Sequence, residues 1–221
     1  MGHVWPADLR EWTFATVVGV VEAHEYEPGE FDYKGALKGS AELLASIQRT
    51  ACSLANTLGG WILFGVKDRR EQVAQPSERI VGIPLEGDLR KEFGDKMQGI
   101  APDVSFETSP RSIPLPDGSA RGLFVVRIPL SSRRPHQVRA TGAFYKRGDG
   151  GTAVTMDVYE VRDQMLGTEE RWRKLRWLRL ELVGYQDAAA DIRRVALTLT
   201  RLMYSLILSQ CIPSVLFIST E

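Results

Sequence analysis

The fold is decided by the stretch from Glu27 to Asp68. It opens with Glu-Pro-Gly-Glu-Phe-Asp-Tyr-Lys (27–34) and closes with Ala-Asn-Thr-Leu-Gly-Gly-Trp-Ile-Leu-Phe-Gly-Val-Lys-Asp (55–68). Both ends have the composition of short strands, and the residues between them have helical periodicity. Gly59 and Gly60 supply the permissive backbone that lets the helix end and turn at once into the second strand. The stretch therefore predicts a strand, a helix and a second strand in close succession.

The first strand is predicted at about residues 30–35, where the sequence alternates with a period of two. Phe31 and Tyr33 point to one face, while Glu30, Asp32 and Lys34 point to the other. Ser40 then has the character of an N-cap. The apolar face of the helix that follows is made of Leu43, Leu44, Ile47, Ala51, Leu54 and Ala55. Cys52 lies in the same apolar stretch, and we expect it to be a small core residue.

The rest of the N-terminal three quarters of the chain predicts further elements on both sides of this stretch. An amphipathic helix is expected over 7–24 and another over 85–100. Strands are expected at 79–83, 103–108 and 121–129, and a hairpin at 136–147 that turns near Thr141-Gly142.

After Thr152 the sequence becomes helical. Thr155 is a candidate cap for a helix that ends at Leu166, and a second helix is predicted over Glu169–Tyr185. A third begins at Asp191 and carries apolar residues that alternate steps of three and four. Such a seam fits either a helical hairpin packed on its own domain or a dimer interface, and both alternatives stay open.

Composition and charge describe a globular chain with a neutral total. The 221 residues carry 28 basic and 28 acidic side chains, but residues 1–110 hold 11 basic and 17 acidic, and the second half holds the reverse. Neutrality argues against indiscriminate DNA coating, while the asymmetry leaves room for a basic face. The two cysteines, Cys52 and Cys211, form no disulfide framework or metal spacing, so a reducing, cytoplasmic location is expected. No signal peptide and no membrane partner are expected.

Several motifs in fixed order resemble one known family, the Schlafen AlbA_2 domain of the AlbA superfamily. The residues that carry the resemblance are Asp32-Tyr33-Lys34, Ala55-Asn56-Thr57-Leu58-Gly59-Gly60, Gly65-Val66-Lys67-Asp68, Val81-Gly82-Ile83, Pro135-His136 and Tyr145-Lys146-Arg147-Gly148. The resemblance covers roughly residues 22–166. It implies an α+β fold and a DNA- or RNA-binding role.

Three carboxylates are candidates for a metal-dependent active site. If the two strands are neighbours, Asp32 and Asp68 could converge, with Glu27 approaching from the preceding turn. Clustered carboxylates repel unless a cation neutralises them, and oxygen ligands suit Mg²⁺ or Mn²⁺. The resemblance implies that Glu27, Asp32 and Asp68 would form the RNA-cleaving site of nuclease members. Glu30 is the alternative acid if the register differs, and the acids are equally well solvated charges at strand ends.

Lys34 shares the face of Asp32. It would either contact a phosphate or stabilise a leaving group, or simply pair with an acid beside it. The chain has no phosphate loop, because Asn56-Thr57-Leu58-Gly59-Gly60 follows a helix and lacks the Lys-Ser/Thr ending. We therefore expect no nucleotide cofactor.

The segment 133–147 is the strongest nucleic-acid signal, because it contains five cations and no Asp or Glu. Its candidate binding residues are Arg133, Arg134, Arg139, Tyr145, Lys146 and Arg147. Interleaved aromatic rings would allow base stacking beside phosphate contacts. The alternative is an ordinary basic hairpin in which Tyr145 packs inward.

The sequence therefore predicts an α+β fold with a mixed sheet, packed helices and a C-terminal helical appendage. The expected divisions are an N-terminal helix (1–21), an AlbA_2-like domain (22–166) and a helical hairpin or coiled-coil tail (167–221). The expected function is binding of DNA or RNA through the basic hairpin. The rivals are a metal-dependent endoribonuclease acting on structured RNA such as tRNA, and an oligomeric protein-interaction module that forms a homodimer through its C-terminal helices.

Overall fold

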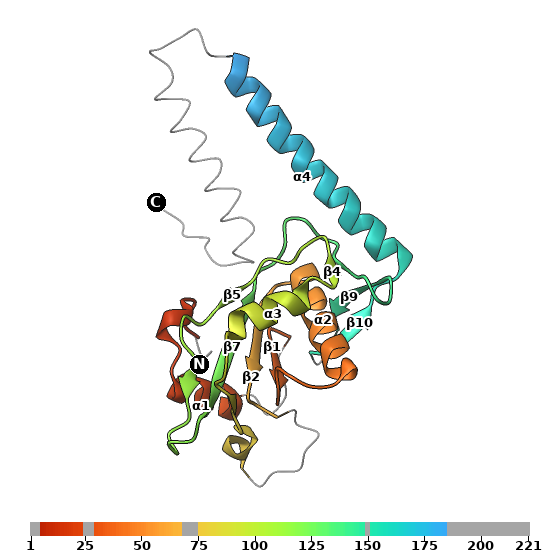
Figure 1. The fold of residues 1–221 in the computed structure, drawn as a ribbon. Coiled ribbons are helices and arrows are strands. Elements are labelled where there is room, and N and C mark those ends of the chain that lie inside the picture. Colours follow the sequence, from red (N-terminus) through yellow and green to blue (C-terminus); the bar gives the residue numbers. More distant parts are fainter. Residues whose placement is uncertain (1–4, 24–28, 68–74, 149–150, 185–221) are drawn as a thin grey trace, which may run out of the picture. The chain divides into compact units, whose positions relative to one another are not determined.

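A computed structural model describes residues 5–23, 29–67, 75–148 and 151–184 (Figure 1). The chain divides into two units, Met1–Thr168 and Glu169–Glu221. All strands of the described part lie in the first unit. The mixture of helices and sheets confirms the predicted α+β fold.

The larger sheet is built around three strands that lie side by side in Figure 1. Strand β1 (Phe31–Lys34) pairs in parallel with β2 (Gly60–Phe64), and β2 pairs antiparallel with β7 (Arg121–Ile128). Three two-residue strands complete it by pairing with β7: β3 (Ile83–Pro84), β5 (Glu107–Thr108) and β6 (Ile113–Pro114). Because β1 and β2 run in parallel, the helix between them is the crossover that such a pair requires.

The smaller sheet is antiparallel and has the strand order β10-β9-β8-β4. Strand β8 (Gln137–Val138) and β9 (Ala143–Arg147) form the predicted hairpin. The flanking strands are β4 (Ile100–Ala101) and β10 (Ala153–Thr155). Gly142 takes a φ of 65° in the connecting turn, which a residue with a side chain rarely adopts.

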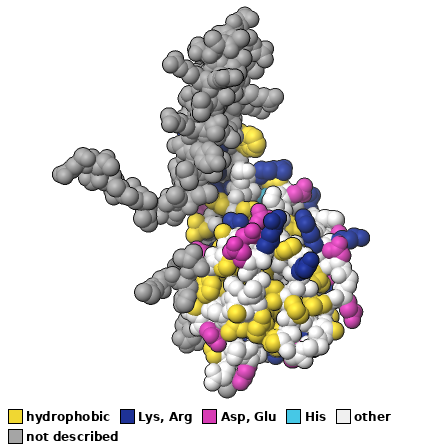
Figure 2. Space-filling model, turned by 90° about the vertical axis from the view of Figure 1, so that its left-hand side faces the viewer, with side chains coloured by type: hydrophobic (Ala, Val, Ile, Leu, Met, Phe, Trp, Pro, Cys, Tyr) yellow, Lys and Arg dark blue, Asp and Glu magenta, His cyan; other side chains and the backbone are white. Residues whose placement is uncertain are grey.

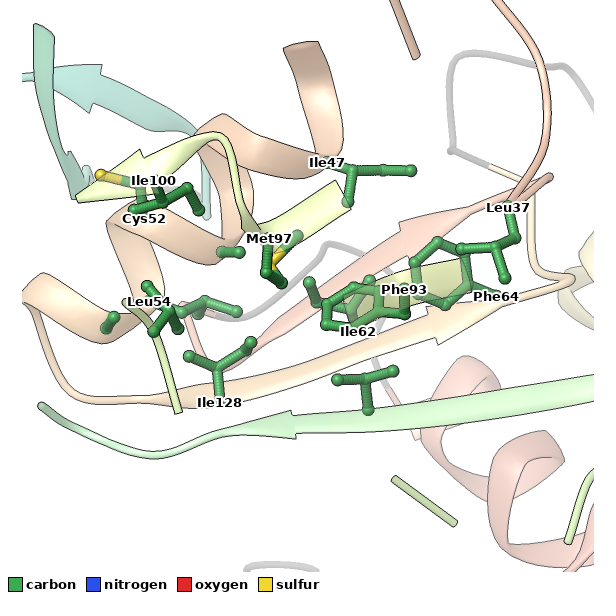
Figure 3. Close-up of a cluster of buried hydrophobic side chains, with 14 of the residues drawn as sticks. Leu37, Ile47, Cys52, Leu54, Ile62, Phe64, Phe93, Met97, Ile100 and Ile128 are labelled. Carbon is green, nitrogen blue, oxygen red and sulfur yellow. The ribbon is translucent and has the colours of Figure 1, made fainter. Parts of the chain in front are cut away.

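Helix α2 (Ala41–Asn56) and α3 (Leu89–Met97) cover one face of the larger sheet. Figure 3 shows the core between these helices and the sheet, where Ile62 and Phe64 of β2 lie among side chains from both helices. Cys52 is fully buried in this core, as predicted. Ser40 accepts a hydrogen bond from the Leu43 amide and is the N-cap predicted for α2.

The opposite face of the sheet is covered by a short 3-10 helix, η1 (Leu9–Glu11), and by α1 (Phe14–Ala23). An aromatic cluster joins these elements to the sheet. In it Phe31 stacks on Trp61 with ring centroids 5.1 Å apart, and Trp12 contacts both rings. A continuous helix over 7–24 was therefore a wrong prediction, because Trp12 takes an extended backbone between the two helices.

The turn between α2 and β2 depends on Gly59 and Gly60. Gly59 has a φ of 76° and Gly60 a φ of 152°. A Cβ atom added at Gly60 would lie 2.2 Å from the carbonyl oxygen of Glu30. No side chain fits that gap, so the second glycine lets β2 approach the residue that precedes β1.

Other boundaries also differ from the prediction. The helix expected at 85–100 is the shorter α3, which begins after Asp88 because the Asp88 carboxylate accepts the Lys91 amide. Of the segment predicted as a strand at 79–83, only Ile83 lies in one, because β3 (Ile83–Pro84) begins there after the 3-10 turn η2 (Pro76–Arg79).

The final described helix, α4, spans Val158–Gly184 without the predicted break near Gly167. Asp157 caps it by accepting the amides of Tyr159 and Glu160, while Thr155 lies in β10. The helix predicted from Asp191 lies outside the described residues. None of the helices in the described ranges is long and apolar enough to cross a membrane.

Candidate nucleic-acid interface and its polar support

Asp32 is a buried carboxylate that is paired with two cations. Its side chain is only 7% exposed, and its Oδ1 lies 3.1 Å from Nη1 of Arg147. Its Oδ2 accepts a hydrogen bond from the Lys34 ammonium. The alternation of β1 produces this arrangement, since Phe31 and Tyr33 enter the aromatic face and Asp32 and Lys34 take the other. Both oxygens of Asp32 are therefore bonded to positive groups.

Arg147 and Lys34 also bond the backbone of β1 on the side away from β2. The carbonyls of Glu30 and Lys34 face β2 and accept the amides of Trp61 at 2.7 Å and Gly65 at 2.8 Å. The carbonyls of the alternate residues Gly29, Phe31 and Tyr33 lie on the other side of the strand. Those of Gly29 and Phe31 accept Nε and Nη2 of Arg147 at 3.1 and 2.6 Å, and that of Tyr33 lies 3.4 Å from the Lys34 ammonium.

Asn56 joins the end of α2 to the basic hairpin. Its amide nitrogen donates to the carbonyls of His136 and Tyr145, both at 2.9 Å, and its Oδ1 accepts the His136 amide at 2.6 Å. The Asn56 side chain is buried, so these bonds replace the hydrogen bonds to water that it loses on folding. One side chain thus fixes β9 and the segment before β8 against the helix.

Thr57 adds a second bond between the same elements. Its hydroxyl accepts the Arg147 amide at 2.9 Å and donates to the Ser53 carbonyl at 2.9 Å. The helix end therefore holds the backbone of Arg147, while the Arg147 side chain holds Asp32. Asn56, Thr57, Arg147 and Asp32 form one continuous network, which we call the polar network.

His136 is fully buried and does not face solvent. Its Nδ1 lies 2.7 Å from the Pro102 carbonyl, so Nδ1 carries the proton and donates it. Burial lowers the pKa of His136 below its ordinary value of 6.5, and the Pro102 bond opposes that shift only partly. The His136 carbonyl also accepts the Cys52 thiol at 3.1 Å, and burial raises the pKa of Cys52 to about 11. Both groups are neutral and structural here.

The six residues predicted to bind nucleic acid divide by exposure. Arg133 and Arg139 are exposed, and Arg134 and Lys146 are half-buried. Lys146 pairs with Glu160 of α4, which lowers the pKa of that carboxyl. Tyr145 is buried in the core and Arg147 lies in the polar network, so their side chains point inward.

Two of the three predicted catalytic acids, Glu27 and Asp68, lie outside the described residues. Their convergence with Asp32 stays a prediction. Within the described ranges, no three His, Cys, Asp or Glu side chains are grouped as a metal site requires. An oxygen-only set would suit Mg²⁺ or Mn²⁺. Each Asp32 oxygen already accepts a bond from one cation, Arg147 or Lys34, and keeps a second lone pair.

Asn56, Thr57 and Glu160 are the important residues that sequence reasoning missed. Asn56 and Thr57 were seen only as part of a helix-to-strand turn. The sequence signal for them was an apolar helix face that ends in two polar residues. Polar side chains that are buried in this way need hydrogen-bond partners. Glu160 had no comparable signal, because one acid in a helical first turn is also a common dipole contact.

The surface shown in Figure 2 is mixed rather than uniformly basic. Lys and Arg side chains gather in the upper part of the described face with acidic side chains between them, and apolar side chains occupy the middle. Broad electrostatic attraction is thus not a property of this face. A basic interface has to be local, as at the hairpin.

Comparison with known proteins agrees with the fold. Residues 27–156 match the family described as Schlafen, AlbA_2. No curated protein matches the chain. One similar solved structure is the DIP2311 protein from Corynebacterium diphtheriae, with 16% identity and a TM-score of 0.42, covering 67% of this chain and 30% of that one.

A second is the N-terminal domain of a putative ATP-dependent DNA helicase RecG-related protein from Nitrosomonas europaea. It has 16% identity and a TM-score of 0.44, and the match covers 67% of this chain and 97% of that domain. The family match extends over more than half of the sequence and includes every residue of the polar network. The chain belongs to the Schlafen AlbA_2 family.

Proposed function

We propose that this chain binds nucleic acid through the basic hairpin, defined as residues 133–147. The observation that carries the proposal is that the side chains of the hairpin divide into an exposed set and a buried set. Arg133 and Arg139 remain exposed, while Tyr145 and Arg147 are used internally to hold the hairpin. No acidic residue lies in the segment to neutralise the exposed pair.

The backbone beside each exposed arginine is fixed. The Arg139 amide donates to the Gly99 carbonyl at 2.8 Å, and the Arg133 amide donates to the Ser131 hydroxyl at 3.0 Å. The polar network holds the rest of the hairpin through Asn56 and Thr57. Cations on a preorganised backbone lose less conformational freedom on binding than cations on a free loop.

The chemistry favours contact with the sugar-phosphate backbone. A guanidinium donates two parallel hydrogen bonds to a phosphate, which matches its planar geometry. Because Tyr145 is buried, Phe144 is the half-exposed aromatic ring left in the segment for stacking on a base. Binding through so few exposed groups would depend on charge more than on sequence.

The test is the salt dependence of binding to labelled duplex DNA, single-stranded RNA and tRNA, measured by fluorescence anisotropy. The double variant Arg133→Glu with Arg139→Glu should weaken binding at least about tenfold at low salt. It should also reduce the slope of log K against log salt by about two, since each lost phosphate contact removes about one unit.

The matched control is Arg10→Glu with Arg111→Glu. These arginines are also exposed and lie outside the hairpin, and their replacement changes the net charge equally. Equal losses in the two double variants would show general attraction and contradict the proposal, as would unchanged binding in the hairpin variant. Thermal melting of both variants confirms that the fold is retained.

A further inference from the structure

Along residues 158–168, one side of helix α4 is bonded to other elements of the first unit. Glu160 pairs with Lys146, Gln164 donates to the Asn56 carbonyl at 3.0 Å, and Thr168 donates to the Arg134 carbonyl. These three residues recur every four positions, so they lie along one side of the helix.

The other side of α4 carries large apolar side chains that are strongly exposed. The exposed fractions are 74% for Val158, 70% for Tyr159, 50% for Met165, 51% for Leu166 and 51% for Trp172. They repeat at intervals of seven, which keeps them on neighbouring lines of the helix surface. Exposed large apolar side chains gathered on one side of a helix mark an interaction surface.

Two charges of opposite sign lie within the same face. Arg162 is exposed between the first and second apolar pairs, and Glu169 is exposed between the second pair and Trp172. They are placed symmetrically about a point between Met165 and Leu166, three and a half residues to either side. Tyr159 and Trp172 are symmetric about the same point.

We propose that this face binds the same face of a second copy of the chain, with the two helices antiparallel. A two-fold axis between Met165 and Leu166 would place Arg162 of one subunit against Glu169 of the partner subunit, twice. It would also place Val158 beside the partner subunit's Trp172, because the axis keeps each line of side chains on its own side of the interface. The central Met165 and Leu166 pairs would also come together. The face is thus complementary to itself in charge.

The charges select the antiparallel orientation. In a parallel pair with matched register, Arg162 would face the partner's Arg162 and Glu169 the partner's Glu169, which is repulsive. Glu169 currently pairs with Arg173 at 2.8 Å, but the two side chains are 63% and 74% exposed. An exposed ion pair of this type contributes little to stability. Exchanging Arg173 for the partner's Arg162 therefore costs little free energy.

Sedimentation velocity of the full chain tests the proposal. The unaltered protein should form dimers at micromolar concentration, and Met165→Glu should convert it to monomers, because the two new carboxylates meet at the axis. Arg162→Glu alone and Glu169→Arg alone should each raise the dimer dissociation constant roughly tenfold or more, because each opposes like charges.

Combining Arg162→Glu with Glu169→Arg should restore dimerisation, since the exchanged charges again face their opposites. The two positions are seven residues apart on one helix, about 10.5 Å at 1.5 Å per residue, so rescue within a single helix is excluded. A face covered by the chain's own residues after 184 would give a monomer at all concentrations and no such rescue.

A cross-link provides a readout that does not depend on stability. In a Cys211→Ser background, Met165→Cys should give a covalent dimer on a non-reducing gel. Lys174→Cys, which is exposed and not three or four residues from any apolar residue of the face, should not. A persistent monomer, a dimer that resists Met165→Glu, or failure of the charge exchange to restore dimers would each overturn the proposal. Circular dichroism identifies any variant that has unfolded.

Discussion

The guanidinium of Arg147 lies 3.1 Å from the carboxylate of Asp32, although 115 residues separate them in the sequence. The pair joins β1 of the larger sheet to β9 of the smaller sheet, and the sheets share no strand. Three family motifs meet here, because Thr57 of the helix end holds the Arg147 backbone. The motifs lie close together because each satisfies a buried polar group of another.

Arg147→Met should strongly destabilise the fold. The substitution leaves the Asp32 carboxylate with Lys34 alone and removes donors from two carbonyls of the segment around β1. Breaking a buried ion pair from one side costs about 3–5 kcal/mol. We expect a loss of that size in the free energy of unfolding, measured by urea denaturation. Arg133→Met, which changes an exposed arginine, should stay within about 0.5 kcal/mol of the unaltered protein.

Asn56→Ala should cost about 2–4 kcal/mol in the free energy of unfolding. The His136 amide and the Tyr145 carbonyl lose the bonds that Asn56 gives them, and the His136 carbonyl keeps only the Cys52 thiol. Each buried unsatisfied group costs about 1–3 kcal/mol unless water enters. Asn56→Asp should be no better at neutral pH. Its oxygen can still accept the His136 amide, but it presents an acceptor to the two carbonyls that need a donor. A small effect in either variant would contradict the role assigned to Asn56.

Stability should fall as the pH drops below about 6.5. Burial lowers the pKa of His136 in the folded state, so the unfolded chain takes up a proton first. Above the ordinary pKa both states are neutral and this contribution is complete. Below it, stability decreases by at most about 1.4 kcal/mol per pH unit until the folded pKa is reached.

The pH measurement is urea denaturation between pH 7.5 and 5.0, where most carboxylates remain ionised. Asp103 and Arg133 are the charged groups that act on His136 with opposite sign. His136→Gln should lower stability at every pH and flatten the slope below 6.5. An unchanged slope in that variant would assign the pH dependence to other groups.

The endoribonuclease prediction can be tested directly on tRNA with Mn²⁺. Because both Asp32 oxygens are paired with Arg147 and Lys34, we expect tRNA to be bound without being shortened. Denaturing gels of the unaltered protein and of Asp68→Ala should then look the same. Cleavage that Asp68→Ala abolishes would instead support the three-carboxylate site and contradict this expectation.

The sequence pattern predicted those helices and strands that are determined by residues close together in the chain. Alternation placed Phe31 and Asp32 on opposite faces of β1, and the Ser40 cap and the two glycines fixed the limits of α2. The predicted end at Leu166 was wrong, since an interior glycine such as Gly167 costs a helix only about 1 kcal/mol and the flanking residues sustain α4. Its cap is Asp157 and not Thr155, and either residue type suits that position.

The candidate site was less predictable because each of its cationic residues could either bind a ligand or pair with a buried group of the fold. An arginine in an acid-free hairpin is equally suited to a phosphate and to a buried carboxylate. Only the tertiary fold, which brings β9 to β1, decides that Arg147 takes the second role and that Arg139 stays exposed. Sequence reasoning named both and could not separate them.

The two cations beside β1 have a consequence for self-association. In the described part of the chain β1 is the terminal strand of its sheet, and a terminal strand normally offers free carbonyls to any extended chain that arrives. Here Arg147 and Lys34 already occupy those carbonyls, so a foreign strand would have to displace buried charges before it could add. Arg147 and Lys34 therefore also hinder the addition of a foreign strand to β1. Loss of Arg147 would expose the free edge of β1 and favour aggregation.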